Sequence, residues 1–403
     1  MSLNFSTIPE AVDAIGRGEV VIVLDDEHRE NEGDYICAAE LATAESINLV
    51  MSGRGDFCMP ILPDAARRLK LTPLVDNNNS NNQTAFLTPL DHVTARTGIT
   101  AEERALCVKA IADPNSKPDD FQRPGHVHLL MAKQGGVLRR AGHTEAAVDL
   151  ARMAGLKPAG VLCEILDDDG ERATRDQLLQ IAKDKNLKII TIEDLIAYRR
   201  VSEKLVSQIA SANLPTKYGD FRVIAYRVQY EAQEPVALVM GDPANGKQAP
   251  LVRMHSSCFT GDLLTSLRCD CGDQLHMALS MIAREGYGVL VYLPQEGRGI
   301  GLAEKIKAYN LQDQGLDTVE ANQALGHKAD SRDYGVGIQI LKDLGMSEVR
   351  LLTNNPKKTE AFNLRGFDLK VVDQVPILPP VNEHNEKYLA TKRDKMGHDL
   401  PID

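Results

Sequence analysis

The stretch Gly288-Val-Leu-Val-Tyr-Leu-Pro-Gln-Glu-Gly-Arg-Gly-Ile-Gly301 decides the fold class of this chain. It opens with a short apolar run that is typical of a buried strand. A glycine-rich turn follows, and residues 302–314 continue as a predicted helix. Such a turn lets the backbone approach a phosphate closely, and the N-terminus of the helix favours an anion. Taken alone, the pattern fits an ordinary turn equally well.

The same alternation of strand and helix runs through both halves of the chain. Strands are predicted at residues 20–24, 187–191 and 348–353, and helices at residues 174–186 and 192–200. This alternation predicts an α/β (α+β) fold with two consecutive mixed-sheet α/β domains. The polar stretch 201–216, which reads as a linker or as partly helical, follows the first half. We therefore expect domains at residues 1–200 and 201–403.

The bulk composition narrows the class of protein. A chain of 403 residues is long for one core and suits two domains. The net charge of −11 argues against a broad grip on nucleic acid, so we expect no nucleic-acid partner. The first residues lack the features of a signal peptide, and no apolar run approaches the ~20 residues of a membrane span, so we expect no membrane partner. An odd number of cysteines, seven, fits a reduced cytoplasmic compartment better than a disulfide framework.

Three cysteines of the second half predict a zinc site. Cys258 is followed by ten other residues and then by Cys269 and Cys271. Thiolates are soft ligands that suit Zn²⁺. Three protein ligands leave a position for water, as in catalytic zinc sites, whereas His255 as a fourth ligand would close a structural site. The sequence favours a catalytic zinc and keeps a structural one as the alternative.

Two further polar runs accompany this cluster. The predicted strand at residues 348–353 leads into Thr353-Asn-Asn-Pro-Lys-Lys358. Its two lysines, Lys357 and Lys358, either contact phosphate or begin a solvated helix. Asp330 and Arg332 are two residues apart, which is usually the spacing of a surface pair.

These runs resemble GTP cyclohydrolase II across about residues 205–400. The matching runs, in order and at the expected spacing, are Arg253–Asp262, Arg268–Gly272, Gln295–Gly301, Leu311–Asn322 and Leu351–Lys358. The resemblance implies that zinc activates a water to attack C8 of the guanine ring of GTP, and that formate and pyrophosphate leave. Zinc lowers the pKa of a bound water towards ~7, which makes this chemistry accessible at neutral pH.

The resemblance also implies roles for single residues. Asp330 would accept a proton, Tyr309 would act in catalysis, and Arg332 would attack the α-phosphate. Because a guanidinium is effectively always protonated, charge stabilisation at the phosphate is the alternative role of Arg332. The residues expected to contact GTP are Arg253, Met254, His255, Ser256, Ser257, Gln274, Glu296, Gly297, Arg298, Thr318, Thr353 and Lys358.

An acidic run in the first half predicts a site for a hard cation. Asp25-Asp-Glu-His-Arg-Glu-Asn-Glu-Gly-Asp34 has six acids in ten residues, directly after the predicted strand at residues 20–24. Mg²⁺ takes oxygen ligands from such runs, although a solvated acidic loop has the same composition. The basic turn at residues 139–145 and Glu164, at the end of an apolar run, would complete a site for a metal and a phosphorylated sugar.

Together with Arg123-Pro-Gly-His126 and residues 157–164 and 191–198, these runs resemble 3,4-dihydroxy-2-butanone 4-phosphate synthase over about residues 5–200. The resemblance implies conversion of D-ribulose 5-phosphate to the four-carbon phosphate and formate, with Mg²⁺ or Mn²⁺ stabilising the enediolate. Glu30 and His143 would be the metal ligands, and His126 and Glu164 would transfer protons. The residues expected to hold the substrate are Arg29, Glu30, Asp34, Arg140, Ala141, Gly142, His143, Thr144 and Glu164.

The chain departs from these families at a few positions. The run Gly53-Arg-Gly-Asp-Phe-Cys58 is more charged than the usual apolar run before the active-site cysteine. Residues 84–98 match imperfectly, although Asp91 and Thr97-Gly98 remain, and His128-Leu129 stands where Phe-Pro is common. In the second half, Ser257 stands where the family usually has glutamate.

Taken together, the two halves resemble the bifunctional riboflavin-biosynthesis family. We therefore expect a cytoplasmic enzyme that acts on GTP and D-ribulose 5-phosphate, and a homodimer, because both component families are usually dimeric. Three alternatives stay open. The chain is a monofunctional GTP cyclohydrolase with a catalytically weak N-terminal scaffold, or its zinc is structural in a nucleic-acid-binding module, or Ser257 allows GTP binding without ring opening.

Overall fold

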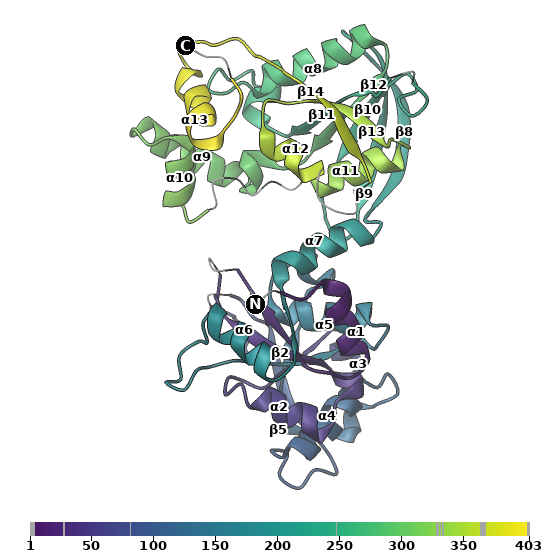
Figure 1. The fold of residues 1–403 in the computed structure, drawn as a ribbon, viewed down its shortest axis with the longest axis vertical. Helices are drawn as coiled ribbons and strands as arrows, with labels where there is room; N and C mark the ends of the chain where they lie inside the picture. The colour runs from purple at the N-terminus through teal and green to yellow at the C-terminus, as the bar shows by residue number, and fades with distance from the viewer. Residues whose placement is uncertain are drawn as a thin grey trace. The chain divides into compact units, whose positions relative to one another are not determined.

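A computed structural model of the chain describes residues 5–26, 29–80, 82–246, 248–327, 330, 332, 334–362 and 368–400. The chain divides into two compact units, Met1–Arg199 and Arg200–Asp403 (Figure 1). Each unit has one seven-stranded sheet that mixes parallel and antiparallel pairs and carries helices. The predicted fold class, two consecutive mixed-sheet α/β domains, is therefore confirmed.

The sheet of the first unit has the strand order β4-β5-β3-β6-β2-β1-β7. Its strands are β1 (Val21–Leu24), β2 (Gly33–Ala38), β3 (Cys58–Ile61), β4 (Phe86–His92), β5 (Phe121–Met131), β6 (Gly160–Glu164) and β7 (Lys188–Thr191). Its helices are α1 (Ile8–Gly16), α2 (Ala44–Met51), α3 (Pro63–Arg68), α4 (Ala101–Ala112), α5 (His143–Met153), α6 (Arg175–Asp184) and α7 (Ile192–Ser202). Strand β3 pairs in parallel with β5, and β1 with β7.

This first sheet is buried on both faces. Ile22 packs into one apolar cluster, while its neighbours Val21 and Val23 pack into a second cluster. Successive side chains of a strand point to opposite faces, so the two clusters lie on the two sides of the sheet. Burial on both sides explains why this strand reads as a continuous apolar run rather than as an alternating one.

The sheet of the second unit has the strand order β14-β13-β11-β12-β10-β9-β8. Its strands are β8 (Val206–Thr216), β9 (Gly219–Val228), β10 (Val236–Met240), β11 (Leu251–Ser256), β12 (Gly288–Leu293), β13 (Glu348–Leu352) and β14 (Lys370–Val375). Its helices are α8 (Cys271–Glu285), α9 (Leu302–Asp313), α10 (Thr318–Ala324), α11 (Gly335–Asp343), α12 (Pro356–Phe362) and α13 (Glu386–Met396).

Three neighbouring strands of the second sheet, β11, β12 and β13, run parallel, so their carboxyl ends meet at one edge. The residues that follow these ends are the cysteine-bearing turn after Ser256, the glycine-rich turn after Leu293, and Thr353-Asn-Asn after Leu352. In open α/β sheets ligands bind at this edge. The topology therefore brings together three motifs that lie far apart in the sequence.

Threonine side chains determine where several helices begin. The Oγ1 atoms of Thr7, Thr43, Thr100 and Thr174 accept the backbone N–H three residues further on, at the start of α1, α2, α4 and α6. Such N-caps satisfy amide groups that have no partner within the helix. Among the described residues, none of the helices combines the length and the apolar character that a bilayer span requires.

Most elements predicted from local patterns are confirmed, including the strand Gly288–Leu293 and the helices α6, α7 and α9. The interpretation of residues 201–216 as a linker or partly helical segment is wrong for most of its length. Helix α7 ends at Ser202, and residues 206–216 form β8 at the edge of the second sheet. The side chains of β8 are almost all exposed, so it lacks the apolar alternation that marks a half-buried strand.

A buried ion pair anchors α7 within the first unit, and its loss is expected to destabilise that unit strongly. The guanidinium of Arg199 is 1% exposed and donates to Asp149 and to the carbonyl of Gly135, both at 2.7 Å. The substitution Arg199→Met would leave the buried Asp149 carboxylate with only one cation, the more exposed Arg152, 3.6 Å away, and breaking a buried pair costs about 3–5 kcal/mol. Urea denaturation followed by circular dichroism would measure this cost.

The matched control is Arg17→Met, because Arg17 forms an exposed ion pair with Glu19 at 2.7 Å. Exposed pairs contribute about 0–1 kcal/mol, so this variant should unfold close to the unsubstituted chain. Equal unfolding midpoints for the two variants would contradict the importance of the buried pair.

Candidate active sites

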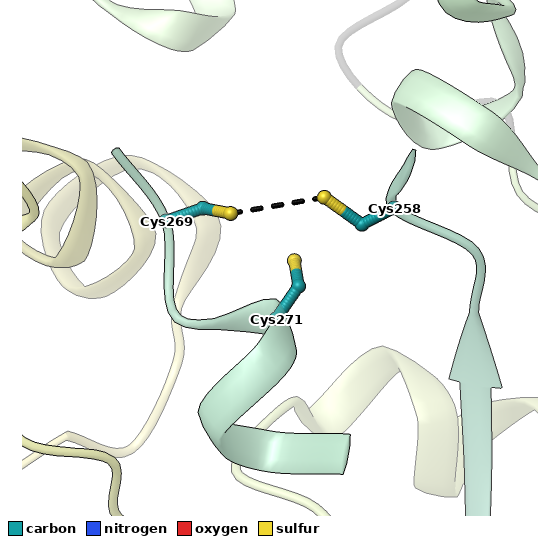
Figure 2. Close-up of side chains that lie close together, drawn as sticks. All are labelled: Cys258, Cys269 and Cys271. Carbon is teal, nitrogen blue, oxygen red and sulfur yellow. Dashed lines mark hydrogen bonds between the residues drawn. The ribbon is translucent and has the colours of Figure 1, made fainter. Parts of the chain in front are cut away.

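Three thiols converge at the edge of the second sheet (Figure 2). Cys258 follows β11, Cys269 lies in the turn before α8, and Cys271 is the first residue of α8. Their sulfur atoms all lie within 4.8 Å of one another, and those of Cys258 and Cys269 are 3.7 Å apart. Tetrahedral zinc with Zn–S bonds of about 2.3 Å separates its sulfur ligands by roughly 3.8 Å. The cluster therefore has the dimensions that bound zinc requires.

The backbone around the thiols is arranged for close approach. A Cβ atom at Gly261 would lie 2.9 Å from the sulfur of Cys269 and 3.1 Å from that of Cys258, so only glycine fits. The carboxylate of Asp262 accepts the backbone N–H of Cys258 at 2.9 Å and the hydroxyl of Tyr292 at 2.8 Å. These contacts hold the cysteine-bearing turn in one conformation.

The thiols perturb one another because they are so close. Hydrogen bonds from Cys269 and Cys271, and then the charge of Lys305, lower the pKa of Cys258 well below its usual range. The bond to Cys258 raises the pKa of Cys269 to about 11, and both neighbours raise that of Cys271. Without a metal the cluster therefore favours a single thiolate. A divalent cation would stabilise all three thiolates, which is a second reason why zinc fits.

His255, the candidate fourth ligand, is directed elsewhere. Its Nε2–H donates to the carboxylate of Asp262, 3.1 Å from both oxygen atoms, and its ring stacks on Tyr292. The group of donor atoms within 4.8 Å of one another contains the three cysteines alone. The thiols instead border a cavity of about 670 Å³ that Glu296, Arg298, Tyr309 and Arg332 also line. This arrangement favours an open position over a closed structural site.

Lys305 is a charged residue of this site that sequence reasoning missed. Its ammonium is buried and lies 3.0 Å from the sulfur of Cys258, 2.9 Å from Oγ1 of Thr260 and 2.8 Å from Oε1 of Glu296. Tyr309, one helical turn further along α9, donates or accepts a hydrogen bond with Thr260 at 3.1 Å. The sequence did contain a signal for Lys305. It lies four residues before Tyr309 in the helix after the glycine-rich turn, and residues four apart share a helix face.

The glycine-rich turn has an unusual backbone. Gly297 and the non-glycine residue Arg298 both adopt left-handed conformations, with φ of 62° and 63°. A left-handed conformation at a non-glycine residue is uncommon and is concentrated at functional sites. Arg298 donates to Oγ1 of Thr318 at 3.4 Å, and both residues line the cavity beside the thiols.

A second cavity, of about 470 Å³, adjoins the first and shares Ser256, Cys271, Arg332 and Tyr388 with it. The residues predicted to contact GTP are divided between the two. The thiol cavity is lined by Ser256, Ser257, Glu296, Gly297, Arg298 and Thr318, and the second cavity by Arg253, His255, Ser256, Gln274, Thr353 and Lys358. Met254 lines neither, because its side chain is buried in the core and only its carbonyl faces Lys358 Nζ, at 2.7 Å. The side chain of Lys357 lies outside the described residues.

Asp330 and Arg332 form a partly buried pair rather than an exposed one. The Nε–H and backbone N–H of Arg332 donate to Asp330 at 2.8 and 3.1 Å. Arg332 lines both cavities, whereas Asp330 lines neither. Burial acts to lower the pKa of Arg332, but Tyr334 and Asp330 outweigh it and raise the pKa further. The guanidinium therefore stays protonated, which favours charge stabilisation over nucleophilic attack.

In the first unit, a cavity of about 460 Å³ collects most of the predicted synthase residues. Those lining it are Arg29, Glu30, Asp34, Arg140, His143, Thr144 and Glu164, together with Glu32, Asp56 and Cys58. Ala141 and Gly142 form the turn before α5 and do not line the cavity.

His143 presents an unused metal ligand to a group of carboxylates. Its Nε2–H donates to the carbonyl of Val23 at 2.9 Å, so Nδ1 carries the lone pair. This Nδ1 is buried without a partner, 3.7 Å from Asp34 and 4.0 Å from Glu32. With Asp25 and Glu30, His143 also forms a group of donor atoms that lie within 4.8 Å of one another.

The carboxylates of this cavity are held close together at an electrostatic cost. Burial first, and then the neighbouring acids, raise the pKa of Glu32 to about 7 and that of Asp34 well above its usual range. A bound cation would relieve this repulsion. Oxygen ligands with one imidazole fit Mg²⁺ or Mn²⁺ better than they fit a soft metal.

The structure does not bring His126 into this cavity. Its Nδ1–H donates to Asp91 at 2.7 Å, its backbone N–H donates to the same carboxylate at 2.9 Å, and its side chain is half exposed. Gly98 packs against Asp91 so closely that a Cβ would lie 2.3 Å from an oxygen of that carboxylate. The residues retained in the 84–98 segment, Asp91 and Gly98, thus hold His126 in place, and His126 is not among the residues that line the cavity with Glu164.

The two main departures of the first half meet in space. Nδ1–H of His128 donates to Asp56 at 3.0 Å, and the backbone N–H of Asp56 donates to Glu164 at 2.7 Å. Cys58 lies directly opposite His128 on the neighbouring strand, and burial with nearby Asp56 raises its thiol pKa. Sequence reasoning noted both departures but had no local signal that they form one contact.

Comparison with known proteins finds a matching enzyme family for each half of the chain. The family of 3,4-dihydroxy-2-butanone 4-phosphate synthase matches residues 9–198, and that of GTP cyclohydrolase II matches residues 207–376. The riboflavin biosynthesis protein RibBA of Bacillus mycoides (strain KBAB4) is 54% identical over 399 residues, covering 99% of this chain and 100% of that protein. RibBA of Bacillus cytotoxicus is 52% identical over 399 residues, with the same coverage of both chains. A crystal structure of RibBX, a two-domain 3,4-dihydroxy-2-butanone 4-phosphate synthase from A. baumannii, has a TM-score of 0.71 and 35% identity, and the match covers 92% of this chain and 99% of that one.

Each of the two α/β units has its own cavity and matches an enzyme family, so the chain is a two-domain enzyme. The chain belongs to the family of bifunctional riboflavin biosynthesis proteins. It combines a 3,4-dihydroxy-2-butanone 4-phosphate synthase, a lyase, with a GTP cyclohydrolase II, a hydrolase, and these enzymes act on D-ribulose 5-phosphate and GTP. The monofunctional alternative is not favoured, because the full-length relatives span both halves. The second half is an enzyme domain rather than a nucleic-acid-binding module.

Proposed function

We propose that residues 1–200 form the synthase domain and residues 201–403 the cyclohydrolase domain, each with its own metal. The first would use Mg²⁺ or Mn²⁺, and the second would use Zn²⁺. The two family matches fall on either side of the division between the compact units, which supports this assignment.

In the second domain, Cys258, Cys269 and Cys271 would hold the zinc. The observation that carries this proposal is the convergence of three thiols beside a cavity, with no described fourth ligand among them. Zinc there would act as a Lewis acid that activates water for attack on the guanine ring. Lys305 supports the site because its ammonium, which also donates to Oγ1 of Thr260, stabilises the Cys258 thiolate.

The remaining residues of the second domain would bind and orient GTP and stabilise charge. Arg332, held by Asp330, would stabilise negative charge on a phosphate group rather than attack it, because its guanidinium stays protonated. Tyr309 lies where a hydroxyl can exchange a proton with Thr260 or with bound nucleotide. The proposed GTP contacts are Arg253, Met254 (through its carbonyl), His255, Ser256, Ser257, Gln274, Glu296, Gly297, Arg298, Thr318, Thr353 and Lys358.

Ring opening is expected to survive the replacement of the usual glutamate by Ser257. The backbone N–H of Ser257 donates to the carbonyl of Leu293 at 2.8 Å, so its placement beside the metal turn does not depend on its side chain. Glu296, which lines the same cavity, still places a carboxylate near the thiols, where it pairs with Lys305 at 2.8 Å.

In the first domain, Glu30 and His143 would bind the divalent metal, with the buried Nδ1 of His143 as the imidazole donor. Arg29 and Arg140 would hold the substrate phosphate, since guanidinium groups bind phosphate through paired donors. The pKa of Glu164 is raised above its usual range, chiefly by burial, which suits a carboxyl group that transfers protons.

The position of His126 supports the proposed homodimer. This half-exposed histidine lies outside the cavity of its own chain, so it would reach a bound sugar phosphate only from another chain. We also propose a cytoplasmic location with small-molecule partners only, because every cysteine is a free thiol, which fits a reducing compartment.

Separate metal requirements give the direct test of this proposal. Chelation followed by dialysis should stop both reactions of the purified chain. Zn²⁺ alone should then restore formate release from GTP, and Mg²⁺ or Mn²⁺ alone should restore the four-carbon phosphate from D-ribulose 5-phosphate. These expectations follow from ligand softness. Thiolates are soft ligands that suit Zn²⁺, whereas carboxylate oxygens are hard ligands that suit Mg²⁺ or Mn²⁺. Restoration of GTP turnover by Mg²⁺ alone would refute the zinc assignment, and an untreated sample serves as control.

A further inference from the structure

Helix α13 and the turn after it form one wall of the second cavity, although the GTP cyclohydrolase II family match ends at residue 376. Tyr388, Lys392 and His398 line this cavity. Helix α13 lies against α10 (Figure 1), and Lys395 Nζ is 2.9 Å from Glu320 of that helix. The backbone N–H of Asp399 donates to the carbonyl of Asn354 at 2.9 Å. The C-terminal segment is therefore docked on the site by specific contacts.

One of these contacts reaches the cysteine-bearing turn. Lys392 Nζ lies 2.6 Å from Oδ1 of Asp270, the residue between Cys269 and Cys271, and Asp270 is fully buried. The other oxygen of Asp270 accepts the amide of Gln274 at 2.7 Å, and Gln274 accepts in turn from Arg253. Lys392 is thus the cation that compensates a buried negative charge inside the metal-binding turn.

The cavity has more basic groups than carboxylates that could compensate them, and burial, then the neighbouring Arg253 and Arg332, lower the pKa of Lys358 well below its usual range. Lys392 and Arg332 are paired with Asp270 and Asp330, but Arg253 and Lys358 are buried with no described carboxylate at ion-pair distance. Arg253 donates to the carbonyl of Leu352 at 2.8 Å, and Lys358 to that of Met254 at 2.7 Å. Buried charge is costly unless a counter-charge accompanies it.

Several buried polar atoms around this cavity also lack partners. They include Nε of Arg253, Nδ1 of His255, Oγ of Ser256 and Nε2 of His398. Buried donors and acceptors are nearly always paired in folded proteins, so a group of unpaired ones points to a missing ligand. A ligand with several anionic oxygens would satisfy both the unpaired atoms and the uncompensated cations.

We infer that α13 and the turn after it complete the nucleotide site, with Lys392 positioning the metal-binding turn and His398 binding the polyphosphate of the nucleotide. The inference rests on the proposed function of the second domain. It adds a segment that lies more than a hundred residues beyond the thiols in the sequence and that the matched family region does not include.

Substitution of His398 separates binding from metal retention. His398→Ala should raise the KM for GTP about tenfold, the loss expected for one hydrogen bond to a charged group, with the zinc content unchanged. Inhibition by inorganic pyrophosphate should weaken by a similar factor. His398→Gln, whose amide can still donate from nearly the same place, should recover most of the affinity. A KM and pyrophosphate inhibition unchanged in His398→Ala would overturn the binding role.

Substitution of Lys392 tests the positioning role. Lys392→Met leaves Asp270 buried and unpaired, so the chelator concentration that removes half of the zinc should fall about tenfold or more. The double variant Asp270→Asn/Lys392→Met removes both charges and should retain zinc better than Lys392→Met alone. The matched control is Lys387→Met, at an exposed lysine on the same helix. Zinc retention equal in Lys392→Met and Lys387→Met would overturn the positioning role.

The synthase reaction of the same preparations reports whether the first domain is folded, and thermal unfolding reports on the second. If the unsubstituted chain with zinc failed to turn over GTP, the proposed function would fail. If it turned over GTP and all the α13 variants matched it, only the present inference would fail.

Discussion

Replacing Cys271 by serine is expected to abolish ring opening of GTP while leaving conversion of D-ribulose 5-phosphate unchanged. The three thiols are the only described donors within 4.8 Å of one another at this site, so the loss of one leaves too few ligands for zinc. Lewis-acid activation is worth several kcal/mol, so formate release from GTP should fall by about 1,000-fold or more. Zinc per chain, measured by mass spectrometry, should fall in parallel.

The matched control is Cys107→Ser, at a buried thiol of the first unit that belongs to none of the donor groups. This variant should keep its zinc and its GTP turnover. Full zinc content together with normal turnover in Cys271→Ser would show that the cluster does not hold the catalytic metal. Cys258→Ser and Cys269→Ser should behave as Cys271→Ser does.

The second large effect is expected at Glu164, where substitution by glutamine should stop the synthase reaction without releasing its metal. An amide can still accept the backbone N–H of Asp56, which Glu164 accepts at 2.7 Å, so the local structure should persist. An amide cannot transfer a proton, and the loss of general acid–base catalysis costs about 100- to 10,000-fold. Formation of the four-carbon phosphate from D-ribulose 5-phosphate with Mg²⁺ would measure the effect.

His143→Ala provides the contrasting variant. It removes the buried Nδ1 donor, so it should stop the same reaction by weakening Mn²⁺ binding, which electron paramagnetic resonance detects. Glu40→Gln, at a carboxylate that pairs with Lys157 and does not line the cavity, is the control for loss of an acid. Substantial turnover in Glu164→Gln would assign proton transfer to another group. All three variants should keep GTP turnover.

Local patterns were sufficient to predict the fold class and most of the elements tested. The apolar run Gly288–Leu293 is β12 with the same bounds, because a strand buried on both faces carries its signal in consecutive residues. The exposed edge strand β8 carries no such signal, and it was missed for that reason. Pairing along an edge depends on the neighbouring strand, which a local window does not include.

Short motifs likewise predicted which residues would gather at each site when they lay close together in sequence. The turn from Cys258 to Cys271 is one such case, and the carboxylates before β2 are another. Contacts across long separations could not be predicted. Lys392 meets Asp270 across 122 positions, and His128 meets Asp56 across 72. The hydrogen bonds of His126 to Asp91 and of His255 to Asp262 also join residues that no local pattern connects.

The different donor sets of the two cavities have a consequence for the balance of products. A single polypeptide fixes the number of synthase and cyclohydrolase centres at a one-to-one stoichiometry, whatever the level of expression. Under the proposed metal assignment, three sulfur donors take zinc, whereas oxygen donors with one imidazole take magnesium or manganese. Zinc starvation would therefore unbalance the supply of the two precursors, and no change in the amount of this chain would restore it.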